Sequence, residues 1–126
     1  MTEINSRREG TLIANTVTGE VELDTLAEFV ERHIGEWADS PVLWDLSGVN
    51  LEQVSSAKLQ AFTVAMATVA DKRAGGRTAI YAPEDLQFGM MRVFEVFAEN
   101  VAIPIDFCVF KTLEEARSWL AQEAES

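Results

Sequence analysis

The stretch from Val42 to Ser56, VLWDLSGVNLEQVSS, constrains the fold more than any other part of this chain. Its first five residues carry a single charge, Asp45, and they lie between Pro41 and Gly48, a pattern typical of a short buried strand. A helical pattern follows, so the stretch predicts a strand, a loop and a helix in that order. We expect Asp45 at the carboxyl end of the strand, where open parallel sheets gather ligands and partners. The loop from Ser47 to Ser56 is therefore the first candidate site.

The residues before this stretch predict a hairpin and a helix. Strand-like segments at Glu3–Arg7 and Thr11–Val17 are separated by Gly10, which is typical of a hairpin turn. From Asp24, the expected N-cap, apolar side chains recur every three or four residues, which predicts a helix. Pro41 disfavours helical geometry in the residue before it, so this helix should end near residues 39–41.

The residues after the stretch continue the alternation of helices and strands. The expected elements are a helix capped by Ser55 or Ser56 and running to Arg73, a strand at Thr78–Ala82, a helix at Glu84–Asn100, a strand at Ile105–Phe110, and a helix that begins with a capping box of Thr112 and Glu115. This alternation predicts an α/β sandwich with a mixed, mostly parallel sheet of four to five strands and four helices. We expect a single domain over residues 1–126, because no repeat or linker divides the chain.

The chain is strongly acidic, with 21 acidic against 10 basic residues and a formal net charge of −11. This charge repels phosphate backbones and anionic headgroups, so it argues against nucleic-acid binding and favours a basic protein partner. No apolar run approaches the roughly 18 residues of a membrane span. The amino terminus lacks the apolar core of a signal peptide, and Cys108 is the only cysteine, which excludes an intramolecular disulfide. We therefore expect a cytoplasmic protein.

The sequence does not contain the usual catalytic and metal-binding patterns. His33 is the only histidine and lies on the apolar stripe of its helix, so we expect a structural role rather than a zinc site. The G-x-S-x-G turn of serine hydrolases is absent, and Gly75–Gly76 lacks the spacing of a phosphate loop. The one trio that could serve an enzyme is Asp45, Glu52 and Arg92. We expect no catalytic activity, no metal and no cofactor.

The expected helix at Glu84–Asn100 carries apolar side chains around most of its circumference. One stripe, expected to face the core, consists of Leu86, Met90, Val93 and Phe97, and further apolar surface is spread over Phe88, Met91, Phe94 and Val96. Either this helix is deeply covered, or it offers a surface to a second copy of the chain or to a ligand. Gly89 lies inside the helix, where glycine costs about 1 kcal/mol relative to alanine, and this cost invites a packing explanation.

The segment VLWDLSGVNLEQVSSAKL resembles the strand, loop and helix of STAS domains, the family of anti-sigma-factor antagonists. Asp45–Val49 matches the D-L-S and the apolar residue that follow the strand in that family. Ser55–Ser56 is similar to the family's serine pair, of which the first is the phosphoacceptor in regulated antagonists. Val54 stands where that pattern has an acidic residue and Ala57 where it has glycine. A plain helix N-cap is therefore the competing interpretation of Ser55.

Three further segments resemble the uncharacterised bacterial SpoIIAA-like branch of this family. They are Gly76–Pro83, Phe88–Glu95 and Val109–Leu120. The resemblance covers most of the chain from Val42 onward. It implies a STAS-like fold, which is related to the lipid-binding CRAL-TRIO domain.

The residues and the resemblance together predict a non-enzymatic STAS-like binding or regulatory module that acts on a protein partner and forms a homodimer. The candidate partner- or ligand-binding residues are Asp45, Ser47, Ser55, Ser56, Phe88, Met91, Arg92 and Phe94. The alternative is a carrier of a small hydrophobic, lipid-like ligand. That alternative requires a pocket of roughly 300–1,000 Å³ beside Met90, Met91, Phe94 and Phe97, and a fully packed helix would exclude it.

Overall fold

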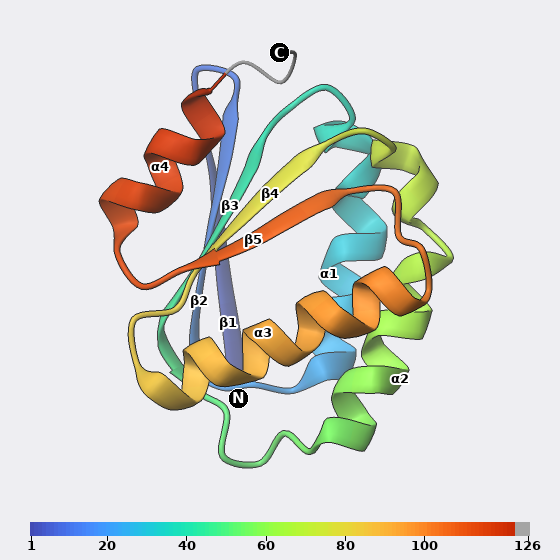
Figure 1. The fold of residues 1–126 in the computed structure, drawn as a ribbon, viewed down its shortest axis with the longest axis vertical. Helices are drawn as coiled ribbons and strands as arrows, with labels where there is room; N and C mark the ends of the chain where they lie inside the picture. Colours follow the sequence, from blue (N-terminus) through green and yellow to red (C-terminus); the bar gives the residue numbers. More distant parts are fainter. Residues whose placement is uncertain (123–126) are drawn as a thin grey trace.

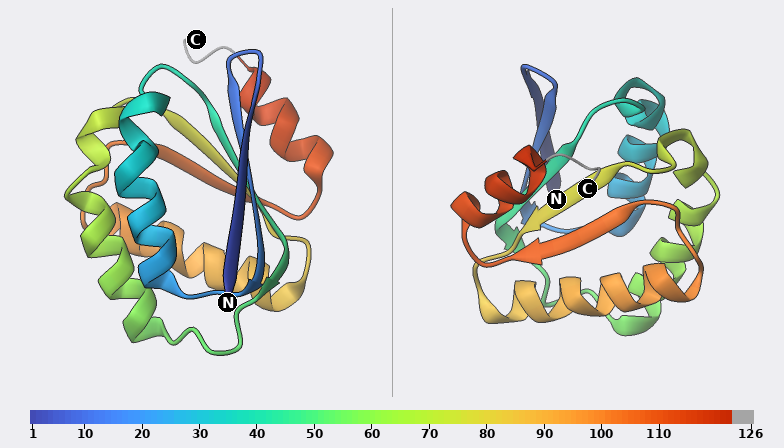
Figure 2. Two further views of the ribbon diagram at one scale, coloured as in Figure 1. Left: turned by 180° about the vertical axis from the view of Figure 1, so that it is seen from behind. Right: turned by 45° about the horizontal axis from the view of Figure 1, so that its top comes forward.

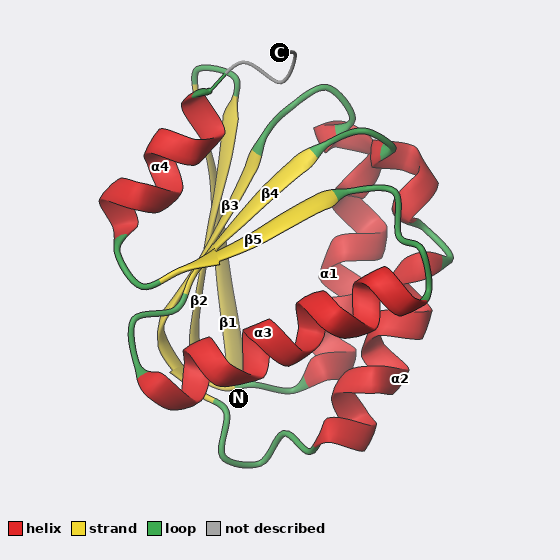
Figure 3. Ribbon diagram, viewed as in Figure 1, coloured by secondary structure: helices red, strands yellow, loops and turns green. Residues whose placement is uncertain are grey.

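The computed structural model describes residues 1–122 of the chain (Figure 1; Figure 3). Its strands are β1 (Thr2–Glu9), β2 (Leu12–Glu20), β3 (Val42–Asn50), β4 (Arg77–Tyr81) and β5 (Asp106–Phe110), and its helices are α1 (Leu23–His33), α2 (Ser56–Ala67), α3 (Asp85–Asn100) and α4 (Leu113–Ala121). Short 3₁₀ helices at Ile34–Trp37 and Ala70–Arg73 follow α1 and α2. The elements occur in the order that the sequence predicts.

The five strands form one sheet in the order β1-β2-β3-β4-β5. Strand β1 runs antiparallel to β2, and all other neighbouring strands are parallel. Each parallel connection advances by one strand in the same direction, so right-handed crossovers place α1, α2 and α3 on the same face of the sheet. Figures 1 and 2 show these three helices on one side and α4 alone on the other. The expected α/β fold, with a mixed, mostly parallel sheet and four helices, is confirmed.

Side chains that alternate along the strands fill a core on each face of the sheet. The core beneath α1–α3 includes the buried residues Val17, Leu46, Leu59, Ile80, Met91, Phe94 and Val109. The core beneath α4 is formed by Leu43, Ala79, Ala116 and Leu120. Each fully buried large side chain contributes roughly 1.5–3 kcal/mol, so the larger core supplies most of the hydrophobic stabilisation.

The amino-terminal hairpin is longer than the sequence predicts. Gly10 turns the chain as expected, with a left-handed φ of 63° that suits glycine. Strand β2 runs on to Glu20, because Gly19 pairs with Thr2 of β1 on one side and with Val49 of β3 on the other. Pairing on both edges therefore overrides the local tendency of a threonine–glycine pair to end a strand.

Helix α1 differs from its prediction at both ends. The Glu22 N–H donates to the Thr2 hydroxyl at 2.7 Å, and this contact fixes the chain where it enters the helix. The helix therefore begins at residue 23 and places Asp24 in its first turn, so the prediction that Asp24 is the N-cap is wrong. At the other end, α1 gives way to a 3₁₀ helix after His33. The His33 ring stacks on Trp37 with centroids 6.3 Å apart, which agrees with the expected structural role.

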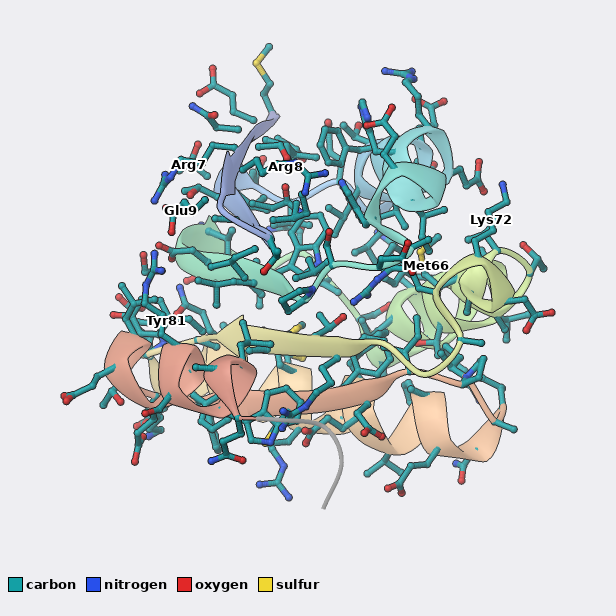
Figure 4. All side chains as sticks on the ribbon, turned by 90° about the horizontal axis from the view of Figure 1, so that it is seen from above. Arg7, Arg8, Glu9, Met66, Lys72 and Tyr81 are labelled. Atoms are coloured by element: carbon teal, nitrogen blue, oxygen red, sulfur yellow. The ribbon has the colours of Figure 1, made fainter. Side chains whose placement is uncertain are left out.

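Glu9 connects the hairpin to α4 on the outer face of the sheet. Its carboxylate accepts hydrogen bonds from Arg7 Nε at 2.6 Å and from Arg117 Nη1 at 3.0 Å. Figure 4 shows Arg7 and Glu9 side by side on the hairpin. The hydrogen bonds from Arg117 and Arg7 lower the pKa of the Glu9 carboxyl.

Strand β3 is four residues longer than predicted, since it continues past Leu46 to Asn50. Strand β4 pairs with it only as far as Asp45, which lies opposite Tyr81, whereas β2 stays beside it to Asn50. A β-bulge just after Asp45 gives β3 one extra residue relative to β2. The prediction that Asp45 ends the strand is therefore wrong, and Asp45 marks only the end of the pairing with β4.

Candidate functional site

The carboxylate of Asp45 is hydrogen-bonded to Ser47 at the bulge of β3. Its Oδ1 accepts hydrogen bonds from the Ser47 N–H at 2.9 Å and from the Ser47 hydroxyl at 2.7 Å. Asp45 and Leu43 point to the same face of β3, and Leu43 packs beneath α4. The side chain of Asp45 therefore lies on the sheet face opposite α1–α3. The structure brings Asp45 and Ser47 together, and it places the carboxylate on the other side of the sheet from Ser55.

Ser55 and Ser56 are exposed where α2 begins. The Ser55 Oγ accepts a hydrogen bond from the Lys58 N–H at 3.1 Å, so Ser55 is the N-cap and Ser56 is the first helical residue. The prediction that one of these two serines caps the helix is confirmed, and the capping residue is Ser55.

A groove of about 470 Å³ lies between the start of α1 and the first turns of α2. Its lining residues are Glu20, Val21, Glu22, Leu23, Asp24, Ala27, Gln53, Val54, Lys58, Ala61, Phe62 and Ala65. We call it the α1–α2 groove. Two lining residues adjoin Ser55: Val54 precedes it in the chain, and the backbone N–H of Lys58 donates to its hydroxyl. The Ser55 cap therefore lies at the edge of the groove.

Charge is distributed unevenly around the α1–α2 groove. Glu20, Glu22 and Asp24 are exposed on the wall formed by the end of β2, the connection and the start of α1, and Lys58 is the one basic residue of the lining. Apart from Gln53, the remaining lining residues are apolar. The groove therefore suits a segment that carries basic side chains beside apolar ones. The groove is not among the predicted sites, although the alternation of acidic and apolar residues in GEVELD, residues 19–24, is a signal for a half-buried acidic edge.

Helix α3 buries a different face from the one predicted. Its buried residues are Gln87, Met91, Phe94 and Ala98. Leu86 and Val93, which were expected in the core, are exposed, so that prediction is wrong. The reason is the side-chain amide of Gln87, whose Nε2 donates to the Val49 carbonyl at 3.1 Å and whose Oε1 accepts from the Glu84 N–H at 3.2 Å. These bonds turn the Gln87 face of the helix towards the sheet.

Phe88 and Arg92 lie at the margin of the core: Phe88 packs against it, and Arg92 is exposed. Phe88 is half-buried, with Lys111 Nζ 5.2 Å and the Arg92 guanidinium carbon 5.9 Å from its ring centroid. Arg92 pairs with Glu95 at 2.9 Å, and Lys111 pairs with Asp85 at 2.7 Å. The hydrogen bond and the charge of Lys111 lower the pKa of the Asp85 carboxyl. Of the four candidate residues on α3, two are thus accessible at the surface and two belong to the core.

An apolar cavity of about 120 Å³ lies between the sheet and α1–α3. Its lining includes Leu26, Leu46, Leu59, Met66, Met91 and Phe94. Arg73 and Thr78 are polar members of the lining, and the Arg73 Nη1 donates to the Thr78 hydroxyl at 2.6 Å. Burial lowers the pKa of Arg73 to about 10. The cavity is smaller than the roughly 300 Å³ that we expect for a lipid-like ligand.

Asp45, Glu52 and Arg92, the trio that could serve an enzyme, do not form a common site. Asp45 is bonded to Ser47 on the α4 face of the sheet, while Arg92 is paired with Glu95 on α3, which covers the other face. Within residues 1–122, no hydrogen bond or ion pair joins Asp45, Glu52 and Arg92. In the same range, no group of three or more histidine, cysteine, aspartate or glutamate residues is placed to hold a metal ion.

No family model and no curated protein sequence matches the chain. An uncharacterised protein of the DUF3478 family with a SpoIIAA-like fold, from Shewanella loihica PV-4, is 20% identical, and the match covers 95% of this chain and 94% of that one with a TM-score of 0.49. An anti-sigma factor antagonist from Mycobacterium paratuberculosis is 14% identical, and the match covers 97% of this chain and 96% of that one with a TM-score of 0.56. The fold is STAS-like.

The STAS-like fold confirms what the strand–loop–helix segment around Asp45 implies from the sequence. In this STAS-like chain, the segment becomes β3, the bulge, the connection from β3 to α2, and the Ser55 cap. At this level of identity the likeness extends to the fold alone, since one fold carries many functions. None of the helices within residues 1–122 has the length and apolar character needed to cross a membrane.

Proposed function

We propose that this chain is a regulatory STAS-like module that binds a protein partner through the α1–α2 groove. The observation that carries the proposal is the position of the groove at the Ser55 cap, where the STAS-like strand–loop–helix segment ends. The acidic wall and apolar lining suit a partner segment that carries lysine or arginine beside apolar side chains. In this proposal the module acts by binding alone, without catalysis or a cofactor.

Electrostatics supports the approach of such a partner. The chain has a net charge of −11, and Glu20, Glu22 and Asp24 concentrate part of it beside the groove. Attraction of this kind raises association rates and weakens as salt increases. Phosphorylation of Ser55 would add negative charge next to Lys58, at the amino-terminal end of α2. We propose this modification as a means of changing the affinity for the partner.

We also propose that residues 1–126 form one cytoplasmic bacterial module and that the module is a homodimer. The single cysteine, which cannot form an intramolecular disulfide, supports a reducing compartment. The homodimer is supported by apolar side chains that α3 exposes to solvent.

Charge reversal in the groove tests the partner proposal. The groove variant carries Glu20→Lys, Glu22→Lys and Asp24→Lys, and a matched control carries Glu31→Lys, Asp39→Lys and Glu114→Lys, which change the net charge equally outside the groove. Proteins cross-linked to each variant in cells are quantified by mass spectrometry, and the affinity of the recovered partner is then measured with purified chains. We expect the control to bind like the wild type and the groove variant to lose about tenfold or more in affinity. Equal binding by all three chains would refute the proposal.

Binding of a small apolar molecule is a second candidate function, favoured by the cavity of about 120 Å³. Engineered apolar cavities of about 150 Å³ in another protein bind benzene or xenon, so we propose a ligand of about that size instead of a lipid-like one. Benzene should then perturb the NMR signals of the lining methyl groups and raise the melting temperature. Ala70 is buried in the lining, so Ala70→Leu should fill the space and abolish both effects. A wild-type chain that is unaffected by benzene would contradict this candidate.

A further inference from the structure

The outward face of α3 carries a line of apolar residues that the chain itself leaves uncovered. Leu86, Val93 and Val96 are exposed by 50%, 38% and 54%. With Gly89 they follow spacings of three, four and three residues, which places all four on one side of the helix. We call this line the α3 stripe. The same spacing is used where two helices pack along each other.

Nothing in the part of the chain that the structure describes requires a glycine at position 89. Glycine inside a helix costs about 1 kcal/mol relative to alanine. A Cβ at Gly89 would meet no atom within 4 Å, and its backbone is not in the left-handed region that favours glycine. Neither packing nor backbone geometry inside residues 1–122 therefore calls for glycine here. The missing side chain instead allows a second backbone to approach α3 near the middle of the stripe.

Charged residues of opposite sign border the stripe. Asp85, Arg92 and Glu99 follow one another at intervals of seven residues, so they lie along one edge of it. When two α3 helices cross antiparallel at Gly89, the same edge of both helices lies on one side of the interface. Arg92 is then within one residue of the level of the partner's Asp85, and Leu86 is within one residue of the level of the partner's Val93. In a parallel pair this edge of one helix would lie on the opposite side of the interface from the same edge of its partner, so Arg92 and the partner's Asp85 would not meet. The pattern is therefore self-complementary in the antiparallel arrangement alone.

We propose that the α3 stripe is the homodimer interface and that two α3 helices cross antiparallel at Gly89. This inference rests on the proposed homodimer and is independent of partner binding, because the α1–α2 groove lies on other helices. Asp85 is already paired with Lys111, yet its side chain is 95% exposed and can accept a second cation. The two symmetry-related pairs of Arg92 with the partner's Asp85 oppose the repulsion between two acidic chains.

Gly89→Ala tests whether the glycine serves the close approach of two α3 helices or only the fold of the single chain. Alanine favours the helix, so the variant should raise the midpoint of urea unfolding measured at a concentration where the chain is monomeric. The added methyl groups should at the same time keep the two helices apart and raise the dimer dissociation constant about tenfold, measured by sedimentation equilibrium. A variant that dimerises as tightly as the wild type would overturn the proposed crossing point.

Charge exchange tests the register of the two helices. Arg92→Glu and Asp85→Arg should each weaken the dimer, because each places like charges across the interface. The double variant restores opposite charges in the same register and should recover most of the wild-type affinity. A double variant that dimerises no better than the single variants would overturn the antiparallel register.

Val93→Asp and Val64→Asp test the surface itself. Val64 on α2 is exposed by 52%, so it offers a matched control away from the stripe. We expect Val93→Asp to abolish dimerisation and Val64→Asp to leave it unchanged, with both variants folded by circular dichroism. A wild-type chain that stays monomeric, or a dimer that tolerates Val93→Asp, would overturn the inference. Partner capture measured on the same variants should be unchanged, which keeps this result separate from the test of the groove.

Discussion

The side-chain amide of Gln87 on α3 donates a hydrogen bond to the backbone carbonyl of Val49 on β3 at 3.1 Å. A second, longer contact of 3.4 Å reaches the Ser47 carbonyl. Both carbonyls lie beyond Asp45, where the pairing of β3 with β4 stops. Gln87 is exposed by only 3%, so it supplies the donor that a neighbouring strand would otherwise provide. One buried polar side chain thus positions α3 on the sheet.

Gln87→Ala should destabilise the fold by about 1–3 kcal/mol, because it removes the donor to the Val49 carbonyl of β3, which is buried. Urea unfolding followed by circular dichroism measures this loss. Gln60→Ala is the matched control, since Gln60 is exposed on α2 and the change in helix propensity is the same. If the two variants lost equal stability, Gln87 would not have the positioning role assigned to it.

The order of strands and helices could be predicted because its signals are local. Gly10, Pro41 and Pro83 mark turns, and the apolar residues between them recur with the period of a strand or a helix. Ser55 could be predicted as a cap for the same reason, since the residue that caps a helix lies next to it in sequence.

The length of β3 and the buried face of α3 could not be predicted from local signals. Gly48 and Asn50 are unfavourable in strands, yet pairing with β2 keeps them extended. That extension creates the unpaired carbonyls that Gln87 satisfies, and a glutamine in an apolar helix does not by itself indicate burial. Once Gln87 faces the sheet, Leu86 and Val93 must face solvent. The α1–α2 groove was likewise missed because it forms only when α1 and α2 pack side by side.

Ser55→Ala should cost about 1 kcal/mol of stability, because the first turn of α2 loses the oxygen that accepts from the Lys58 N–H. Ser56→Ala should be neutral or slightly stabilising, since Ser56 lies inside the helix and alanine favours it. Ser55→Asp should keep wild-type stability, as aspartate is also a good N-cap. Urea unfolding of the three variants makes the comparison.

The two Ser55 variants also show whether Ser55 only caps α2 or in addition controls the affinity for the partner. If Ser55→Ala and Ser55→Asp differ in stability but bind the captured partner equally, Ser55 is a cap alone. A difference in partner affinity between the folded Ser55→Asp chain and the wild type would support control by charge at this position.

Cys108 should react with thiol reagents only at higher pH than an ordinary cysteine. Burial raises the pKa of the Cys108 thiol, and the negative charge of Glu95 raises it further. The thiolate is the reactive form, so a raised pKa lowers the labelling rate at any given pH below it. Because Cys108 is the only cysteine, iodoacetamide labelling across a pH series reports on this group alone.

Glu95→Gln should shift the Cys108 labelling profile to lower pH, while Glu99→Gln on the same helix serves as the control. The denatured chain should label with the profile of an unperturbed thiol. A native chain whose profile coincides with that of the denatured chain would show that the thiol is not perturbed by its surroundings.

Gly76→Ala should destabilise the chain by about 1–3 kcal/mol through overpacking. A Cβ at Gly76 would lie 2.9 Å from the Arg73 carbonyl oxygen and 2.9 Å from its Nη2. That Nη2 donates to the Ser40 carbonyl at 3.0 Å, so the added methyl group must displace a buried guanidinium from its acceptor. Gly35→Ala is the control, because a Cβ there meets nothing within 4 Å and should leave the unfolding midpoint unchanged or higher. Equal midpoints for the two variants would mean that the chain around Arg73 yields without cost, and the close contact at Gly76 would then have no energetic consequence.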